Sequence, residues 1–244
     1  MVNPIRQAAV RVSTSAGDFR DNHPFVGPAV FISSALYFIV QLVVAWVFTP
    51  SYNLIHNTIS DLGNTSCGTY GGVPLCSPRH LLMNITFCLL GVVMAVGSLL
   101  IYQEFTEHPK PQKIAARVGF SLMAVAGLGT VFVGAFPENT VSGMHILGAG
   151  LAIAGGNLCI LILGVVLVLP DWLRRNMLFY SVIAGTAAVL FASHRYFGLG
   201  AGTTERIAAY PETLWLITFG LFISRNHYRE AKPRTTDEHQ GNPP

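Results

Sequence analysis

The chain has 244 residues, of which 51% are hydrophobic and only 11% are charged. A soluble globular domain normally carries about 25% charged residues, so this composition excludes an ordinary soluble protein and indicates a multi-pass membrane protein. The formal net charge is only +3. We attribute it to basic residues in cytoplasmic loops, and we expect no binding of nucleic acid.

Long apolar segments recur along the chain. About 20 apolar residues span the hydrocarbon core of a bilayer as a helix, and six such windows are expected at 26–48, 81–102, 115–135, 145–169, 177–197 and 208–224. The sequence therefore predicts an all-α polytopic bundle of six transmembrane helices, forming one domain over residues 26–224. The amino tail, residues 1–25, lacks the apolar core of a cleavable signal peptide, so the first helix is expected to direct insertion. Residues 225–244 are predicted to form a disordered tail.

Basic residues predict the orientation, because short cytoplasmic loops retain them. Most of them fall in the two tails, the second loop and the fourth loop: Arg6, Arg11, Arg20, Lys110, Lys113, Arg174, Arg175, Arg225, Arg229, Lys232 and Arg234. Both termini are therefore predicted to be cytoplasmic, and the loops 49–80, 136–144 and 198–207 to face outward. We expect this chain in the plasma (cell) membrane.

The stretch HNTISDLGNTSCGTYGGVPLCSPRHLLMN, from His56 to Asn84, lies between two long apolar segments and contains most of the first outward loop. Cys67 and Cys76 enclose a turn rich in glycine, tyrosine and proline. Outside the cell an oxidising compartment permits a disulfide, whereas the spacing is long for a pair of metal ligands. We therefore predict a disulfide that braces a structured cap.

The later helix ends carry recognisable start signals. Ser77 is expected to cap the second helix, and Asn139 or Ser142 to cap the fourth. Pro211 and Glu212 fit the first turn of the last helix, where a negative charge also suits the helix dipole.

Residues inside the predicted spans are mostly small or apolar. Gly148, Ala152 and Gly156 recur every four residues, which favours close packing of helix backbones. The deepest polar groups are the uncharged Gln41 and Asn157, so a proton or ion path across the whole bilayer is not indicated.

Four histidines fall at outward helix ends and, with one aspartate, suggest a metal centre. Three protein ligands and one open position suffice for catalytic zinc, which lowers the pKa of its bound water to about 7. The candidate zinc ligands are His80, His145, His194 and Asp61, with His56 as a further candidate.

Two other interpretations of these residues remain open. Ser60 is a candidate nucleophile with a histidine such as His145 as its base, and Asp61 a candidate partner that orients the histidine. The candidate residues for holding a lipid phosphate or carboxylate are Arg195, Glu205, Arg206 and Tyr210. Alternatively, Asp61 only caps the loop, and the charged residues only tie the outward loops together.

The chain contains the runs HNTISDLGN and CSPRHLLMN, then FPEN with a later histidine, and ER, Tyr and Trp near the end. In this pattern it resembles a family of bacterial and archaeal multi-helix membrane proteins classed as a domain of unknown function. That resemblance implies a compact helical bundle with a structured first outward loop, and it implies no activity. A weaker likeness in kind is to ceramidase-type membrane hydrolases, in which three histidines, an aspartate and a serine form a zinc site. The chain departs from them by having six predicted helices and no paired HxxxH motif.

Three functions follow from these patterns. The first is a hydrolase or transferase that acts on a lipid amide, ester or phosphate at the outer leaflet, and it is metal-dependent if the histidines converge on a zinc ion. The second is a non-catalytic scaffold whose cap binds a membrane-protein partner, a second copy of the chain or a lipid head group. The third is a small-solute transporter, ranked last because no inverted repeat is evident. Membrane lipids are the expected partners.

Overall fold

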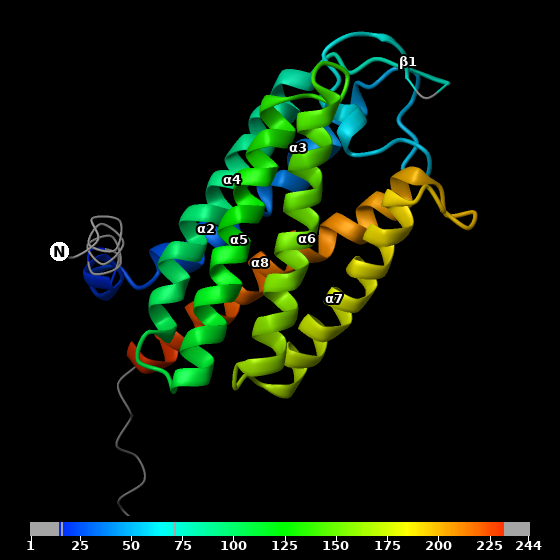
Figure 1. Cartoon of the computed structure of the whole chain (residues 1–244). Helices are drawn as coiled ribbons and strands as arrows, with labels where there is room; N and C mark the ends of the chain where they lie inside the picture. The colour runs from blue at the N-terminus through cyan, green and yellow to red at the C-terminus, as the bar shows by residue number, and fades with distance from the viewer. Residues whose placement is uncertain (1–14, 16, 71, 232–244) are drawn as a thin grey trace, which may run out of the picture.

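The computed structural model describes residues 15, 17–70 and 72–231. Within them, six spans are long and apolar enough to cross a membrane, and they pack side by side as an all-α bundle (Figure 1). The first span comprises two helices, and each of the others is built on one: α2 (Val26–Ser33) with α3 (Leu36–Trp46), α4 (His80–Tyr102), α5 (Lys110–Ala135), α6 (Ser142–Val166), α7 (Asp171–Ala192) and α8 (Ala201–Ala231). The predicted fold class and number of spans are therefore confirmed.

The first span is interrupted in its middle, where one continuous helix was predicted. The hydroxyl groups of Ser33 and Ser34 donate to the carbonyl oxygens of Val30 and Phe31, at 2.7 and 2.6 Å. Backbone bonds also tighten there, since the amide of Ser34 donates to the carbonyl of Phe31. Serine hydroxyls that bond back to the preceding turn bend helices in this way.

The last two helices begin earlier than predicted, α7 at Asp171 and α8 at Ala201. Hydropathy windows missed both starts because the first turns of these helices are polar. Glu205 and Arg206 consequently lie within α8 rather than in an outward loop. Pro211 lies in the interior of α8, so its predicted place in the first turn was wrong.

Glycine contacts bring three helices close together. A Cβ on Gly91 of α4 would lie 2.3 Å from the carbonyl oxygen of Gly127 in α5, and a Cβ on Gly148 of α6 would lie 2.7 Å from that of Gly129. The backbones of α4, α5 and α6 are therefore in direct contact, as the small-residue stripe predicted for α6. Helix α8 crosses obliquely behind them (Figure 1), and its Trp215 stacks on Phe219 with ring centroids 4.8 Å apart.

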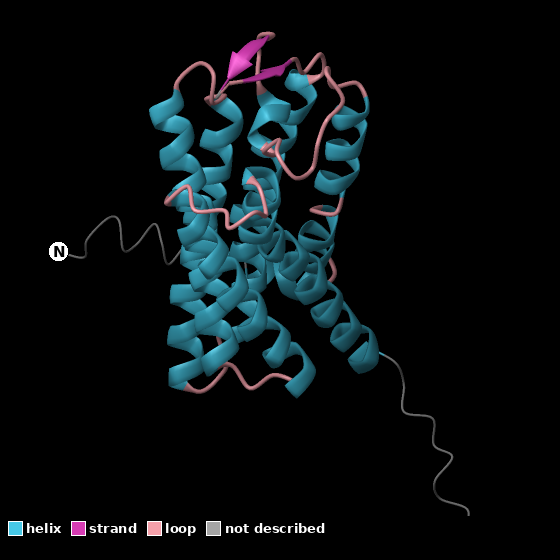
Figure 2. Ribbon diagram, turned by 90° about the vertical axis from the view of Figure 1, so that its right-hand side faces the viewer, coloured by secondary structure: helices cyan, strands magenta, loops and turns pink. Residues whose placement is uncertain are grey.

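A cap closes one end of the bundle (Figure 2). It contains the short 3₁₀ helix η1 (Ser60–Gly63) and an antiparallel pair of strands, β1 (Gly68–Tyr70) and β2 (Val73–Leu75). The predicted disulfide between Cys67 and Cys76 is confirmed at the base of this pair. We call this end, formed by residues 47–70, 72–79, 136–141 and 193–200, the hairpin end, and the opposite end the tail end.

Two predicted helix caps were wrong. Ser77 donates its hydroxyl to the carbonyl of Leu62 at 2.7 Å and does not cap α4, whose first residue is preceded by Arg79. Asn139 and Ser142 do not cap α6. The Asn139 side chain instead donates to the hydroxyl groups of the cap loop. Both side chains therefore stabilise the cap rather than a helix end.

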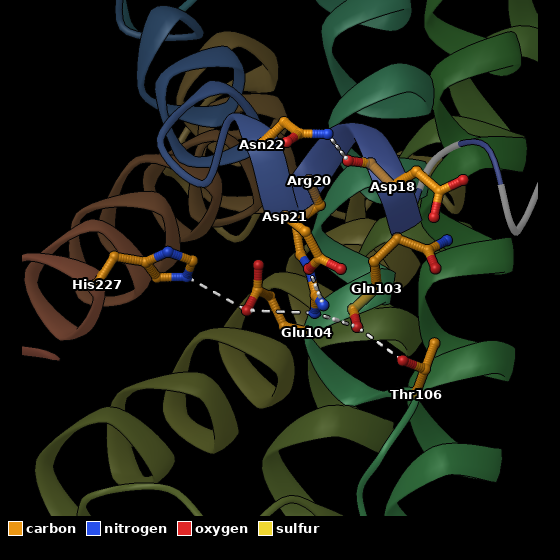
Figure 3. A network of polar contacts seen from close by, with 8 residues as sticks. All are labelled: Asp18, Arg20, Asp21, Asn22, Gln103, Glu104, Thr106 and His227. Carbon is orange, nitrogen blue, oxygen red and sulfur yellow. Dashed lines mark hydrogen bonds and ion pairs between the residues drawn. The ribbon is translucent and has the colours of Figure 1, made fainter. Parts of the chain in front are cut away.

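At the tail end, a polar network joins the amino-terminal segment to α8 and to the 3₁₀ helix η2 (Gln103–Phe105), which follows α4 (Figure 3). Arg20 donates to the carbonyl oxygen of Gln103 at 2.8 Å. Nε2 of His227, in α8, lies 3.2 Å from a carboxylate oxygen of Glu104, which follows α4. These contacts fix the amino-terminal segment against the tail end of the bundle.

Candidate functional site

The loop before η1 holds Ser60 in place through a reciprocal pair of hydrogen bonds. The amide of Asp61 donates to Oγ1 of Thr58 at 3.1 Å, and the amide of Thr58 donates to Oδ2 of Asp61 at 3.0 Å. The side chain of Asn57 donates to the same carboxylate oxygen at 3.0 Å. This is the arrangement of a capping box, so Asp61 orders the start of η1. Among the described residues, no hydrogen bond joins Asp61 to a histidine.

The side chain of Ser60 lies between those of His145 and Glu205, and we call these three residues the Ser60 cluster. Oγ of Ser60 lies 3.0 Å from Nε2 of His145 and 3.1 Å from Oε1 of Glu205. Nδ1 of His145 lies 3.0 Å from the carbonyl oxygen of Phe136, and the amide of Ile59 donates to Oε2 of Glu205. Since His145 and Glu205 are buried, the cluster is a polar core at the hairpin end.

Arg206 binds the protein's own backbone. Its Nη1 donates to the carbonyl oxygens of Leu54, Asn57 and Gly202 at 3.1, 2.8 and 2.8 Å, and its Nη2 donates to the hydroxyl of Tyr52. The guanidinium carbon also lies 5.3 Å from the centroid of the Tyr52 ring. The buried cation therefore clamps the first loop onto α8.

A further carboxyl group lies in the loop between α5 and α6. Oε1 of Glu138 accepts a hydrogen bond from the side chain of Asn64 at 2.9 Å. Burial, and then the nearby carboxylate of Asp61, raise the pKa of Glu138 to about 8. Sequence analysis did not identify Glu138 as a site residue, because its neighbours in space come from a loop more than 70 residues away.

The remaining candidate residues lie apart from the Ser60 cluster. Nδ1 of His80 lies 2.9 Å from the carbonyl oxygen of Ser77, and the exposed His194 contacts the hydroxyl of Tyr196. His56 and Arg195 are exposed. Across residues 15, 17–70 and 72–231, no three histidine, cysteine or acidic side chains are placed to hold a metal ion. The candidate zinc ligands thus do not come together in the described chain.

A cavity extends from the Ser60 cluster into the centre of the bundle. It offers about 60 Å³ to the centres of water-sized molecules, and its walls are mostly apolar. Its polar lining comes from four helices: Tyr37 of α3, Ser60 of η1, Thr130 of α5, and Glu205, Glu212 and Thr213 of α8. A water molecule needs roughly 10–15 Å³ by this measure, so several waters fit.

Glu212 is the deepest acidic residue in this cavity. It is 5% exposed, and no other described residue forms a hydrogen bond with its Oε1. It lies about 16 Å along α8 from Ala201, at roughly 1.5 Å per residue. Gly156 of α6 leaves room for this carboxyl group, since a Cβ at that position would lie 2.1 Å from the carboxyl carbon of Glu212.

Sequence reasoning placed Glu212 in a first turn and so missed it as a site residue. A usable signal was its spacing from Glu205, because residues seven apart share one face of a helix. The prediction that only uncharged groups lie deep in the spans was therefore wrong.

The fold and the site define a six-span helical membrane protein with acidic residues inside its bundle. Residues 31–221 match the family model described as Protein of unknown function (DUF998). Because this match covers most of the chain, the protein belongs to that family, in agreement with the resemblance seen in its sequence. No curated protein and no solved structure matches the chain.

Proposed function

We propose that this protein is a proton-coupled transporter of a small solute, and that Glu212 binds the coupling proton. The observation that carries this proposal is a carboxyl group without a hydrogen-bond partner at Oε1 among the described residues, facing a cavity at the centre of a membrane bundle. Ionisable residues inside membrane spans are costly and are found on proton and substrate pathways of pumps and transporters.

The chemistry around Glu212 favours a proton over a metal cation as its ligand. Calcium takes six to eight oxygen ligands, and magnesium requires an octahedral set. The cavity that Glu212 lines is mainly apolar, with Leu90, Met94 and Val133 among the residues of its walls. A carboxylate that is buried without a partner is unfavourable, and a single proton neutralises it without any further ligand.

The proposed orientation places the hairpin end outside the cell and both termini in the cytoplasm of a plasma-membrane protein. The support is the disulfide of the cap, which needs an oxidising compartment, together with the basic residues of the tail end. Protons would then enter the cavity from the side of the Ser60 cluster.

Carbodiimide labelling tests the proton site, because dicyclohexylcarbodiimide reacts with protonated carboxyl groups in apolar surroundings. We expect Glu212 to be labelled in purified protein, less so as the pH rises, and not at all in Glu212→Gln. Glu107→Gln, at an exposed position, is the matched control and should label like the native chain. Failure of Glu212 to label at any pH would contradict the proposal.

Transport is tested in proteoliposomes that contain a pH-sensitive dye. Addition of the transported solute, drawn from a panel of small polar and cationic compounds, should move protons into the lumen, and Glu212→Gln should abolish this movement. Uptake that is unaffected by Glu212→Gln or by a pH gradient would show that transport is not coupled at this residue.

A second candidate function is the hydrolysis or transfer of an acyl group, which the 3.0 Å contact of Ser60 with His145 favours. The carbonyl of Phe136 would orient the imidazole in place of an aspartate. For this candidate, a fluorophosphonate probe should label Ser60 covalently, and labelling should be lost in Ser60→Ala and His145→Ala. An unlabelled Ser60 would exclude a nucleophilic serine.

A further inference from the structure

The donors and acceptors of the Ser60 cluster can be assigned atom by atom. A carbonyl oxygen only accepts hydrogen bonds, so Nδ1 of His145 carries a hydrogen that it donates to Phe136. Oε2 of Glu205 accepts from the amide of Ile59, which leaves Oε1 as the oxygen that faces Ser60. The Ser60 hydroxyl has one hydrogen and two partners, so one of these partners must donate to it.

Two arrangements satisfy this requirement with the same number of protons. In the first, Glu205 is a carboxylic acid that donates to Ser60, and Ser60 donates to the neutral imidazole of His145. In the second, His145 is an imidazolium that donates to Ser60, and Ser60 donates to the Glu205 carboxylate. The pair of titratable groups has zero net charge in both arrangements.

We infer that the Ser60 hydroxyl relays a proton between His145 at the hairpin end and Glu205 in the wall of the cavity. Transfer toward the cavity breaks the Nε2–H bond of His145 and forms an O–H bond on Ser60. Ser60 at the same time gives its original hydrogen to Oε1 of Glu205. No oxidant, reductant or further reactant takes part.

The positions of Glu205 and Glu212 show where the relayed proton can go. Glu205 and Glu212 line the same cavity and are about 10 Å apart along α8, at roughly 1.5 Å per residue. Water in the cavity can bridge that distance, with Tyr37, Thr130 and Thr213 as additional polar groups on its walls. The inference rests on the proposed proton-coupled function and names the route by which a proton reaches Glu212.

The charged groups packed around the cluster have other partners. Asp61 of η1 accepts from Thr58 and Asn57, and Glu138 of the α5–α6 loop accepts from Asn64. Arg206 of α8 donates to loop carbonyls and to Tyr52. None of these groups forms a hydrogen bond with Oγ of Ser60 among the described residues, so the hydroxyl stays shared between His145 and Glu205.

Nuclear magnetic resonance of ¹⁵N-histidine in the full-length protein tests the relay without any transport assay. In the native chain, protonation at Nε2 of His145 should change in step with that of Glu205, because the two form one coupled pair. Glu205→Gln should hold Nε2 unprotonated, since the new amide donates to Ser60 permanently. Ser60→Ala should let His145 titrate independently, and Ser60→Thr should restore the coupling.

A His145 titration that is unchanged in both Glu205→Gln and Ser60→Ala would overturn the relay. In proteoliposomes, Ser60→Ala should slow proton movement by about 10²-fold, the lower end of the usual effect of a proton-transferring side chain, and Ser60→Thr should recover it. Carbodiimide labelling separates the two proposals. Labelled Glu212 without coupling at His145 refutes the relay, whereas coupling with Glu212 unlabelled at any pH refutes the proposed function.

Discussion

At the scale of single residues, the hairpin end buries polar groups that a membrane protein would normally expose to water. Each of them has a different role. Arg206 holds the first loop through its carbonyl oxygens, Asp61 closes a capping box, and Ser60 joins two titratable side chains. Residue type alone did not distinguish these roles, because each side chain is suited to both ligand binding and loop ordering.

Glu138 gives a prediction about pH. Folding raises its pKa from about 4.5 to about 8, so the folded protein binds a proton that the unfolded chain has released between these values. The stabilising contribution is therefore fully present below about pH 4.5 and is lost as the pH rises to about 8. Glu138→Gln resembles the protonated acid and keeps the acceptor for Asn64, so it should flatten this decline.

The measurement is the melting temperature in detergent between pH 5 and 8, with unfolding monitored by tryptophan fluorescence. Glu107→Gln, at an exposed position on the tail side, serves as the control and should retain the native slope. If Glu138→Gln melts with the same pH dependence as the native protein, another group is responsible.

At the scale of elements, the hydropathy of the sequence predicted the spans, because the bilayer imposes one length and one composition on each of them. It did not predict the break after Ser33 or the early start of α8. Both depend on local polar groups that a window average removes. The contact of Ser60 with His145 joins residues 85 positions apart, and only the packing of η1 against α6 creates it.

The packing of α6 against α8 provides the second prediction. Gly156→Ala places a Cβ 2.1 Å from the carboxyl carbon of Glu212, so we expect a loss of about 1–3 kcal/mol of stability. Gly150→Ala in the same helix meets nothing within 4 Å and should be neutral or slightly stabilising. Thermal melting of the two variants measures the difference.

The double variant Gly156→Ala with Glu212→Ala distinguishes crowding from a general defect of α6. Removing the carboxylate makes room for the new methyl group, so the double variant should melt no lower than Glu212→Ala alone. Additive losses would place the strain elsewhere in the helix.

At the scale of the whole molecule, the two ends of the bundle differ in chemistry. The disulfide and the Ser60 cluster are at the hairpin end, whereas Lys110, Arg174 and the basic end of α8 are at the tail end. We predict that the tail end faces the cytoplasm. Green fluorescent protein that is fused after residue 107 or 231 should therefore fluoresce. Alkaline phosphatase that is fused after residue 139 should be active on the periplasmic or secreted side.

Fusions to the full-length chain and to the truncated chains must be compared in the same cells, since the expression level affects the signal of both reporters. Alkaline phosphatase that is active after residue 107 but inactive after residue 139 would invert the proposed orientation. Protons would then enter the Ser60 cluster from the cytoplasm.

Pro211 adds a mechanical consequence to this arrangement. Proline has no backbone N–H, so inside α8 it leaves the carbonyl group of Ile207 without its usual intrahelical donor and weakens one rung of the helix. The missing rung separates the half of α8 that is anchored by Arg206 from the half that is embedded among the aromatic rings of Trp215 and Phe219. Helix α8 is therefore weakest in backbone hydrogen bonding directly beside Glu212, between its two anchored halves.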